Sequence, residues 1–273
     1  MNTNYSIPCF ANNCRNFGNA TAIIRPQTFS SLNLLVIVTG IVGIILNTIL
    51  LIGFYTKRSF HKPTYCLLAN LAICDVLLGL ASLSNFAIIS LASRARIPAN
   101  IFLVICKLFS VFPVHLSYTA SIQTLTMISS ERYLAIFRPN SELTRRKAII
   151  LCLIAWIISL CISFPFIITT SITTGRPFTR CIAFKSYTSW TSIIYVILFV
   201  GHFVLPAVII TTLYSLILRR LSEAVQGHSE SSSSKKLKRK TIYMLLTTTT
   251  LFFSFYTMGI IVGYYNNNWN IRI

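Results

Sequence analysis

Long stretches without charged residues follow one another along this chain and are separated by short polar segments. Six of them are apolar and long enough to cross a bilayer, whose hydrocarbon core of about 30 Å needs roughly 20 helical residues. Their apolar side chains do not alternate at every second position, which favours helices over the strands of a membrane barrel. The pattern predicts an all-α, polytopic transmembrane helix bundle. The six predicted spans cover residues 33–55, 64–91, 101–134, 148–168, 189–218 and 241–264.

The polar segments define the predicted topology. Residues 1–32 form an extracellular N-terminus, 33–265 the bundle, 219–240 the third cytoplasmic loop and 266–273 a short tail. Lys and Arg are concentrated in alternate loops, which places the N-terminus outside and the chain in the plasma membrane as a multi-pass protein. The net charge of +19 then reflects topology and contact with anionic membrane lipids. A nucleic-acid partner is not expected, because that would require a soluble basic face.

The predicted extracellular segment holds two kinds of modification site. Asn4 and Asn19 each begin an Asn-x-Ser/Thr triplet, so both are candidate glycosylation sites. Cys9 and Cys14 either close a small local loop or stay free, and their spacing does not decide between the two. These residues agree with an external N-terminus.

Three charged residues within or at the ends of spans suggest function. Asp75 is the only acid deep inside a span, where an ionisable group costs about 2.5 to 3.5 kcal/mol, so we expect it to have polar partners. Glu131 and Arg132 are adjacent at the inner end of the third span, where the carboxylate can hold the guanidinium and release it. For Asp75, the alternative is an interhelical hydrogen-bond network that holds no ion. For Glu131 and Arg132, the alternative is an ordinary interfacial ion pair worth little energy.

The segment from Ser130 to Ile136, followed by Pro139, resembles the Asp/Glu-Arg-Tyr signature that ends the third span of rhodopsin-like (class A) G-protein-coupled receptors. The resemblance extends over five successive spans. It implies a seven-helix receptor bundle, of which six spans are predicted here, and coupling to a heterotrimeric G protein. The other matching residues are Asn47, the stretch Asn70 to Asp75, Trp156 with Pro165, and Pro206 with Tyr214.

The resemblance assigns roles to individual residues. Glu131, Arg132 and Tyr133 would form the activation switch, and the released Arg132 would contact the G protein and Tyr214. Trp156 and Pro206 would be structural residues of the fourth and fifth spans.

The same resemblance implies an ion site and a disulfide. Asp75 and Ser121 would hold a sodium ion, with Asn47 in the same polar network. Cys106 and Cys181 would form a disulfide that fixes an outer loop over the ligand entrance.

The chain also departs from the family pattern. The interval from Cys106 to Arg132 is one residue longer than usual, and a kink at Pro113 is expected to absorb it. After Lys240 there is neither a Cys-Trp-x-Pro motif nor a seventh span with Asn-Pro-x-x-Tyr, so the chain is expected to be truncated or divergent there. The alternative to a signalling receptor is therefore a non-signalling variant that binds ligand or dimerises with full-length receptors. A small multi-pass transporter is the third choice, because no internal repeat supports it.

The distribution of charge restricts the ligand. No Asp or Glu lies in the outer half of the predicted bundle, which disfavours a biogenic amine. An anionic ligand or acidic peptide would suit four outer arginines, although these could equally contact lipid head groups. His115 and His202 are pocket candidates, or satisfied interhelical hydrogen-bonders. No nucleophile, nucleotide or metal constellation supports an enzyme, and no cofactor is expected beyond sodium. The four arginines are Arg94, Arg96, Arg176 and Arg180.

Overall fold

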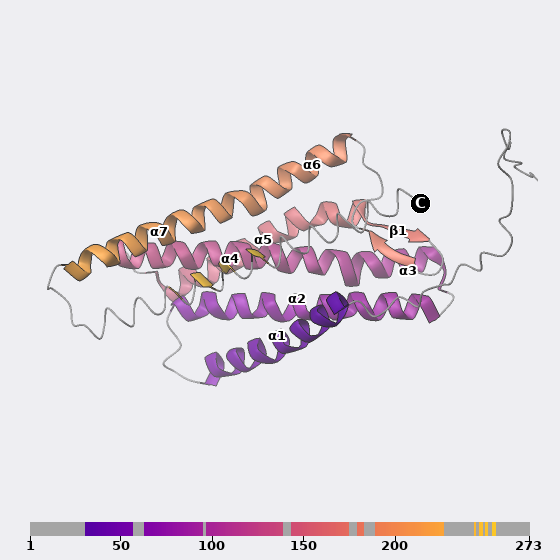
Figure 1. The fold of residues 1–273 in the computed structure, drawn as a ribbon, viewed down its shortest axis with the longest axis horizontal. Helices are drawn as coiled ribbons and strands as arrows, with labels where there is room; N and C mark the ends of the chain where they lie inside the picture. The colour runs from indigo at the N-terminus through magenta and orange to yellow at the C-terminus, as the bar shows by residue number, and fades with distance from the viewer. Residues whose placement is uncertain are drawn as a thin grey trace, which may run out of the picture.

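A computed structural model describes five of the six predicted spans and part of the sixth (Figure 1). Asn4, Asn19, Cys9, Cys14 and the tail 266–273 lie outside the described residues, as do Arg176 and most of the loop 219–240. The described residues are 31–56, 63–94, 97–138, 143–174, 179–182, 189–226, and positions 243, 246, 247, 249, 250, 253 and 254.

Helices occupy each described span. Within the described residues, five helical stretches are long and apolar enough to cross a membrane. Most of the predicted span 241–264 is outside the described residues, and the positions that are described in it are helical. The helices are α1 (Ser31–Thr56), α2 (Pro63–Arg94), α3 (Ala99–Cys106), α4 (Phe112–Phe137), α5 (Arg145–Thr169), α6 (Ser189–Phe199) and α7 (Leu205–Gln226).

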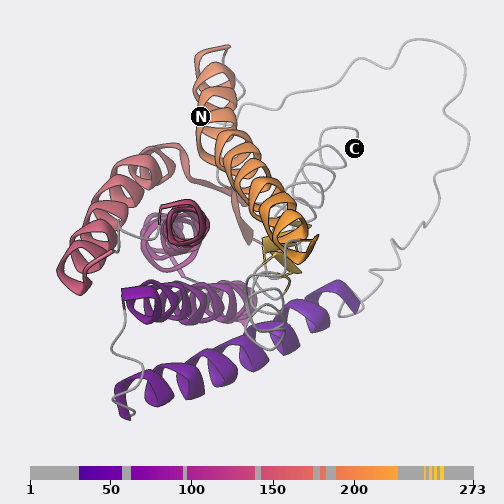
Figure 2. The same cartoon turned by 90° about the vertical axis from the view of Figure 1, so that its left-hand side faces the viewer.

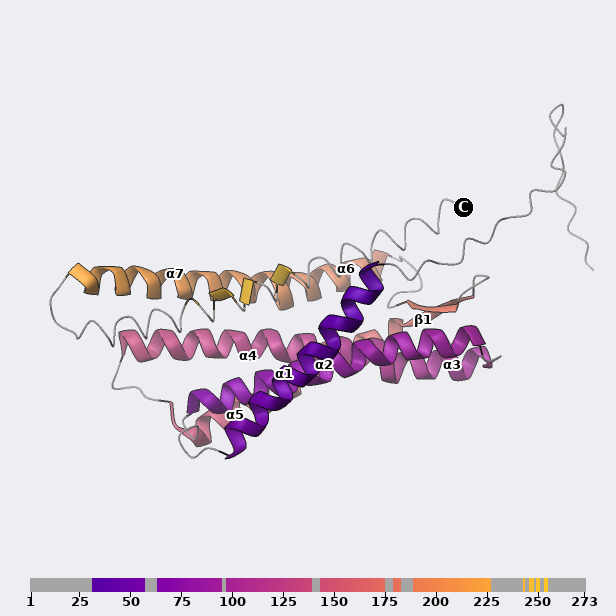
Figure 3. The same cartoon turned by 60° about the horizontal axis from the view of Figure 1, so that its bottom comes forward.

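The third span, which consists of α3 and α4 in one continuous helical stretch, lies at the centre of the bundle. Viewed end-on, α4 is surrounded by α2, α5 and α7, all of which contact it (Figure 2). The first span, α1, crosses α2 obliquely and packs mainly against that helix (Figure 3). Since α4 contacts three neighbours, its polar side chains are the ones that can link several spans. Fully buried core residues where these helices meet include Leu67, Leu125, Ile128 and Ile217.

A π-turn accommodates the extra residue between Cys106 and Arg132. In η2 (Lys107–Val111) the turn ends with a hydrogen bond from the N–H of Phe112 to the carbonyl of Lys107, five residues earlier. Such a turn adds about one residue to the helix without ending it. Pro113 follows directly, and it has no N–H to donate. The register above Pro113 is therefore set by a π-turn and not by a proline kink alone.

The fifth span contains the same arrangement. In η3 (Val200–Val204) the N–H of Leu205 donates to the carbonyl of Val200, and Pro206 is the next residue. His202 lies within this π-turn. The His202 side chain is therefore attached to a segment of backbone that is wider than an α-helix.

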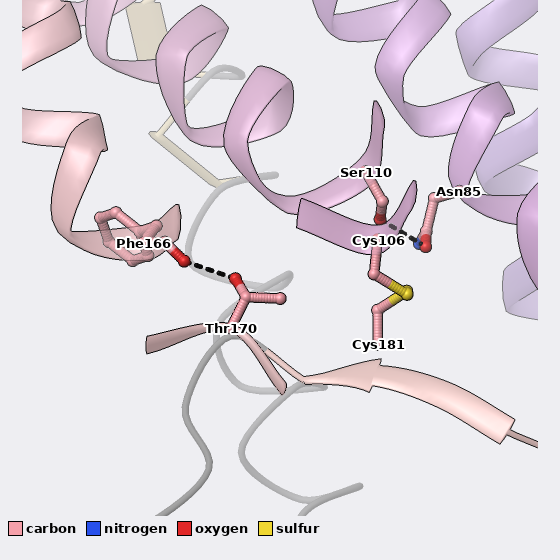
Figure 4. Close-up of a disulfide and its surroundings, with 6 residues drawn as sticks. All are labelled: Asn85, Cys106, Ser110, Phe166, Thr170 and Cys181. Atoms are coloured by element: carbon pink, nitrogen blue, oxygen red, sulfur yellow. Dashed lines mark hydrogen bonds between the residues drawn. A yellow bond between two sulfur atoms is a disulfide. The ribbon is translucent and has the colours of Figure 1, made fainter. Parts of the chain in front are cut away.

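An antiparallel hairpin covers one end of the bundle. Strand β1 (Ser171–Thr174) pairs with β2 (Thr179–Ile182), and Ile172 is opposite Cys181. A disulfide joins Cys181 to Cys106 at the end of α3, so the hairpin is fastened to the third span (Figure 4). This is the disulfide that the sequence resemblance implied.

Small residues allow α1 and α2 to approach closely. A Cβ atom added to Gly79 would lie 2.7 Å from Cγ1 of Ile44 and 3.1 Å from the carbonyl oxygen of Gly40. Close helix packing through glycine is common in membranes, where helices associate without a hydrophobic driving force. Gly79 therefore sets the distance between the first two spans.

Gly79→Ala is expected to destabilise the bundle, because the new methyl group overlaps Ile44. Overpacking of this kind costs about 1–3 kcal/mol, so the Tm of the purified protein should fall. Gly53→Ala is the matched control, since nothing lies within 4 Å of its added Cβ. Adding Ile44→Ala to Gly79→Ala should recover part of the loss. An unchanged Tm for Gly79→Ala would contradict the close approach.

Candidate functional site

Thr64, Glu131 and Arg132 meet near the start of α2 and the end of α4. Nε of Arg132 lies 3.2 Å from Oε2 of Glu131. The hydroxyl of Thr64 donates a 2.9 Å hydrogen bond to Oε1 of the same carboxylate. Each carboxylate oxygen of Glu131 thus has its own partner, one from its own helix and one from α2.

The contact between Glu131 and Arg132 is an ion pair and not a well-formed hydrogen bond. Neither Nε nor Oε2 meets hydrogen-bond geometry with a partner in the described part of the chain, although both atoms are buried. The side chains are 28% and 14% exposed for Arg132 and Glu131, so the pair is less screened than a surface pair. A partly buried pair with poor geometry suits a contact that can break when a better partner for the arginine is available.

Tyr214 brings α7 into this site. Its ring is 1% exposed and belongs to the main buried cluster. Its hydroxyl interacts with the side chain of Thr249 and with the charge of Arg132, although it makes no hydrogen bond of strict geometry among the described residues. A buried hydroxyl whose hydrogen bond is poorly formed can gain from an arginine that moves toward it.

Tyr133 has different contacts from Glu131 and Arg132. It stacks on Phe137 with ring centroids 4.4 Å apart, and it packs against the buried cluster. The structure therefore gives Tyr133 a packing contact within α4. It does not bring Tyr133 to the ion pair.

Asp75 and Ser121 meet deeper in the bundle. The hydroxyl of Ser121 donates a long 3.4 Å hydrogen bond to Oδ1 of Asp75, which links α2 to α4. Asn47 is not joined to them, because its amide donates to the carbonyl of Gly43 in its own helix at 2.9 Å. Of the three predicted members, the structure brings together two.

A buried network that sequence reasoning did not anticipate links three spans. Asn70 donates to the hydroxyl of Thr124 at 2.8 Å, and the indole N–H of Trp156 donates to the Asn70 side-chain oxygen at 2.9 Å. Trp156 was expected only as a structural residue. The signal in the sequence was an asparagine within an apolar span, because such a side chain needs partners from other helices.

The two histidines lie on the third and fifth spans. His115 stacks on Phe166 of α5 with ring centroids 3.6 Å apart. Nε2 of His202 is buried without a hydrogen-bond partner among the described residues. The expectation that both histidines are satisfied interhelical hydrogen-bonders therefore stays a prediction, and Nε2 of His202 does not have such a partner among the described residues.

Further polar contacts lie at the end of the bundle where the disulfide joins Cys106 to Cys181. The hydroxyl of Ser110 in η2 donates to the side-chain oxygen of Asn85 at 2.7 Å, next to Cys106 (Figure 4). The backbone of Arg180 is paired with Thr173 in the hairpin. Within the described part of the chain, no group of three or more His, Cys, Asp or Glu residues could hold a metal ion.

These apolar helices, and the polar contacts buried between them, define a multi-pass helical membrane protein. Residues 46–270 match the family model described as 7 transmembrane receptor (rhodopsin family). The chain belongs to this family of rhodopsin-like, class A G-protein-coupled receptors. The expected family and the seven-helix fold class are confirmed.

Individual relatives are distant and longer. The chain is 29% identical over 189 residues to a Gq-coupled rhodopsin of Mizuhopecten yessoensis, which covers 67% of this chain and 37% of the relative. It is 30% identical over 125 residues to dopamine receptor 4 of Caenorhabditis elegans, covering 45% and 23%. It is 33% identical over 196 residues to 2-oxoglutarate receptor 1 of Rattus norvegicus, covering 69% and 56%. The chain thus spans less than two thirds of each of these relatives.

Proposed function

We propose that this chain transmits an extracellular ligand signal across the plasma membrane to a heterotrimeric G protein, with its N-terminus outside. The observation that carries the proposal is the arrangement of Glu131 between Thr64 and Arg132, near the hydroxyl of Tyr214. Family membership and the excess of basic residues in alternate loops support the same function and orientation.

The mechanism follows from two competing partners for one guanidinium. In the described conformation Arg132 is paired with Glu131, and Thr64 keeps that carboxylate in place. Opening of the bundle end would separate the pair and allow Arg132 to reach Tyr214 and the G protein. A ligand drives this change only if it binds the open state more tightly.

Glu131→Gln is expected to raise ligand-independent nucleotide exchange on a G protein. The amide cannot pair with Arg132 as a carboxylate does, so the closed state is weakened. A coupling of about 1 kcal/mol corresponds to roughly fivefold more exchange. Adding Arg132→Ala should remove the gain, and both variants should keep the wild-type Tm within a few degrees. Equal exchange by all three proteins, across a panel of Gα subunits, would contradict the switch.

We propose an anionic ligand. The names of the relatives mention both an amine and 2-oxoglutarate, so they do not decide between the two classes. The charges of this chain favour an anion, because its sequence has no Asp or Glu from residue 76 to 130 or from 143 to 222. Nε2 of His202 has no hydrogen bond to any residue that the structure describes, and it can pair with a ligand carboxylate or phosphate through a proton on the ring. Arg176 and Arg180 add positive charge in the outer loop.

We also propose a sodium site at Asp75. From the residues that the structure describes, the carboxylate receives one long hydrogen bond, donated by Ser121, so it retains lone pairs for a hard cation. The Ser121 oxygen is a second hard ligand atom. These residues would hold the ion between α2 and α4. Bound there, sodium would supply the positive charge that a carboxylate within a membrane needs.

Sodium is therefore expected to raise the Tm of the purified protein relative to potassium at equal ionic strength. A cation that binds only the folded state stabilises it by mass action. Asp75→Asn should abolish the difference between the two salts, and Asn47→Ala should preserve most of it. A sodium effect of wild-type size in Asp75→Asn would overturn the assignment.

A further inference from the structure

A groove lies along the outer side of α7, away from the switch. Its volume is about 410 Å³, and it is lined by Thr211, Thr212, Ser215, Leu216 and Arg219. All five side chains are exposed. The buried face of the same helix carries Ile210, Tyr214 and Ile217, so the groove lies on a different face from the residues that pack into the bundle.

The polar residues of this groove form one stripe. Thr211, Ser215 and Arg219 are four residues apart, which places them on one side of the helix over about 12 Å at about 1.5 Å per residue. The hydroxyl of Ser215 donates to the backbone oxygen of Thr211 at 2.7 Å. Within the described part of the chain, the hydroxyls of Thr211 and Thr212 make no hydrogen bond, so both can accept or donate to a ligand.

A polar stripe of this kind is unusual for a lipid-facing surface in this protein. The exposed positions of α5 between residues 149 and 168 are occupied by Ile, Leu, Phe and one Cys. An arginine beside three hydroxyls has a different chemistry, because its charged guanidinium lies next to neutral groups that can form hydrogen bonds. The sequence of groups along the helix, from the arginine to the hydroxyls, matches a phospholipid, which has a phosphate at the membrane surface and ester carbonyls deeper in the membrane.

We propose that this groove binds one anionic glycerophospholipid of the cytoplasmic leaflet. Arg219 binds the phosphate, and Thr211 and Thr212 donate to the ester carbonyls deeper in the membrane. The assignment rests on the orientation proposed above, which places the Arg219 end of α7 at the cytoplasmic surface. Charge complementarity supports an anionic occupant, since the chain carries 24 Lys and Arg against 5 Asp and Glu.

The test is native mass spectrometry of the full chain in detergent with phosphatidylglycerol or phosphatidylcholine. Wild type should retain one phosphatidylglycerol in preference to phosphatidylcholine. Arg219→Ala should weaken its retention about tenfold, the size of one charge-assisted hydrogen bond. Thr212→Val should weaken retention without changing the charge. Arg146→Ala is the matched control, because Arg146 is exposed at the start of α5 and outside the groove.

Three results would overturn the proposal. Equal losses in Arg219→Ala and Arg146→Ala would mean that the lipid responds to overall charge and not to this site. Full competition by soluble glycerol phosphate would mean that the groove binds a free phosphate and not a lipid. Equal retention of the two lipids by wild type would mean that no anionic lipid is selected. The measurement involves no G protein, so it can fail or succeed independently of the proposed signalling function.

Discussion

The demand that every polar group inside the membrane finds a partner governs this structure. The backbone N–H and C=O groups of a helix form hydrogen bonds within that helix. Polar side chains such as Asn70 and Glu131 must find partners on other helices. They do so on or through α4, where Asn70 reaches Thr124 and Ser121 reaches Asp75. The polar contacts therefore converge on a helix that contacts three other spans. A movement of α4 relative to α2 or α7 would change several of them together.

Backbone irregularities shape the end of the bundle that carries the Cys106–Cys181 disulfide. The π-turns η2 and η3 each precede a proline, and each widens its helix. The first brings Ser110 to Asn85 beside the disulfide, and the second contains His202, whose Nε2 has no hydrogen-bond partner within the described ranges. Sites for a ligand commonly form where a helix departs from regular geometry. This end therefore has the features of a ligand site, and Thr64, Glu131 and Arg132 meet toward the opposite end.

Much of the fold could be predicted from hydropathy alone, because each described span is a continuous apolar run. The ion pair was predictable too, since Glu131 and Arg132 are neighbours in the sequence. The location of η2 was not, because the extra residue between Cys106 and Arg132 can be absorbed at more than one place in the helix. Nor was Thr64, which is separated from Glu131 by 67 residues and resembles many other threonines in apolar spans. Contacts between distant residues depend on helix rotation, which hydropathy does not fix.

The central claim is that Thr64 acts on Arg132 only by holding Glu131. A double-mutant cycle on ligand-independent nucleotide exchange tests it most directly, with Thr64→Val, Glu131→Gln and the combined variant compared with wild type. The account predicts that Thr64→Val raises exchange on its own and adds nothing once Glu131 is Gln. Effects that multiply in the combined variant would show that Thr64 acts independently of the carboxylate and would contradict the account.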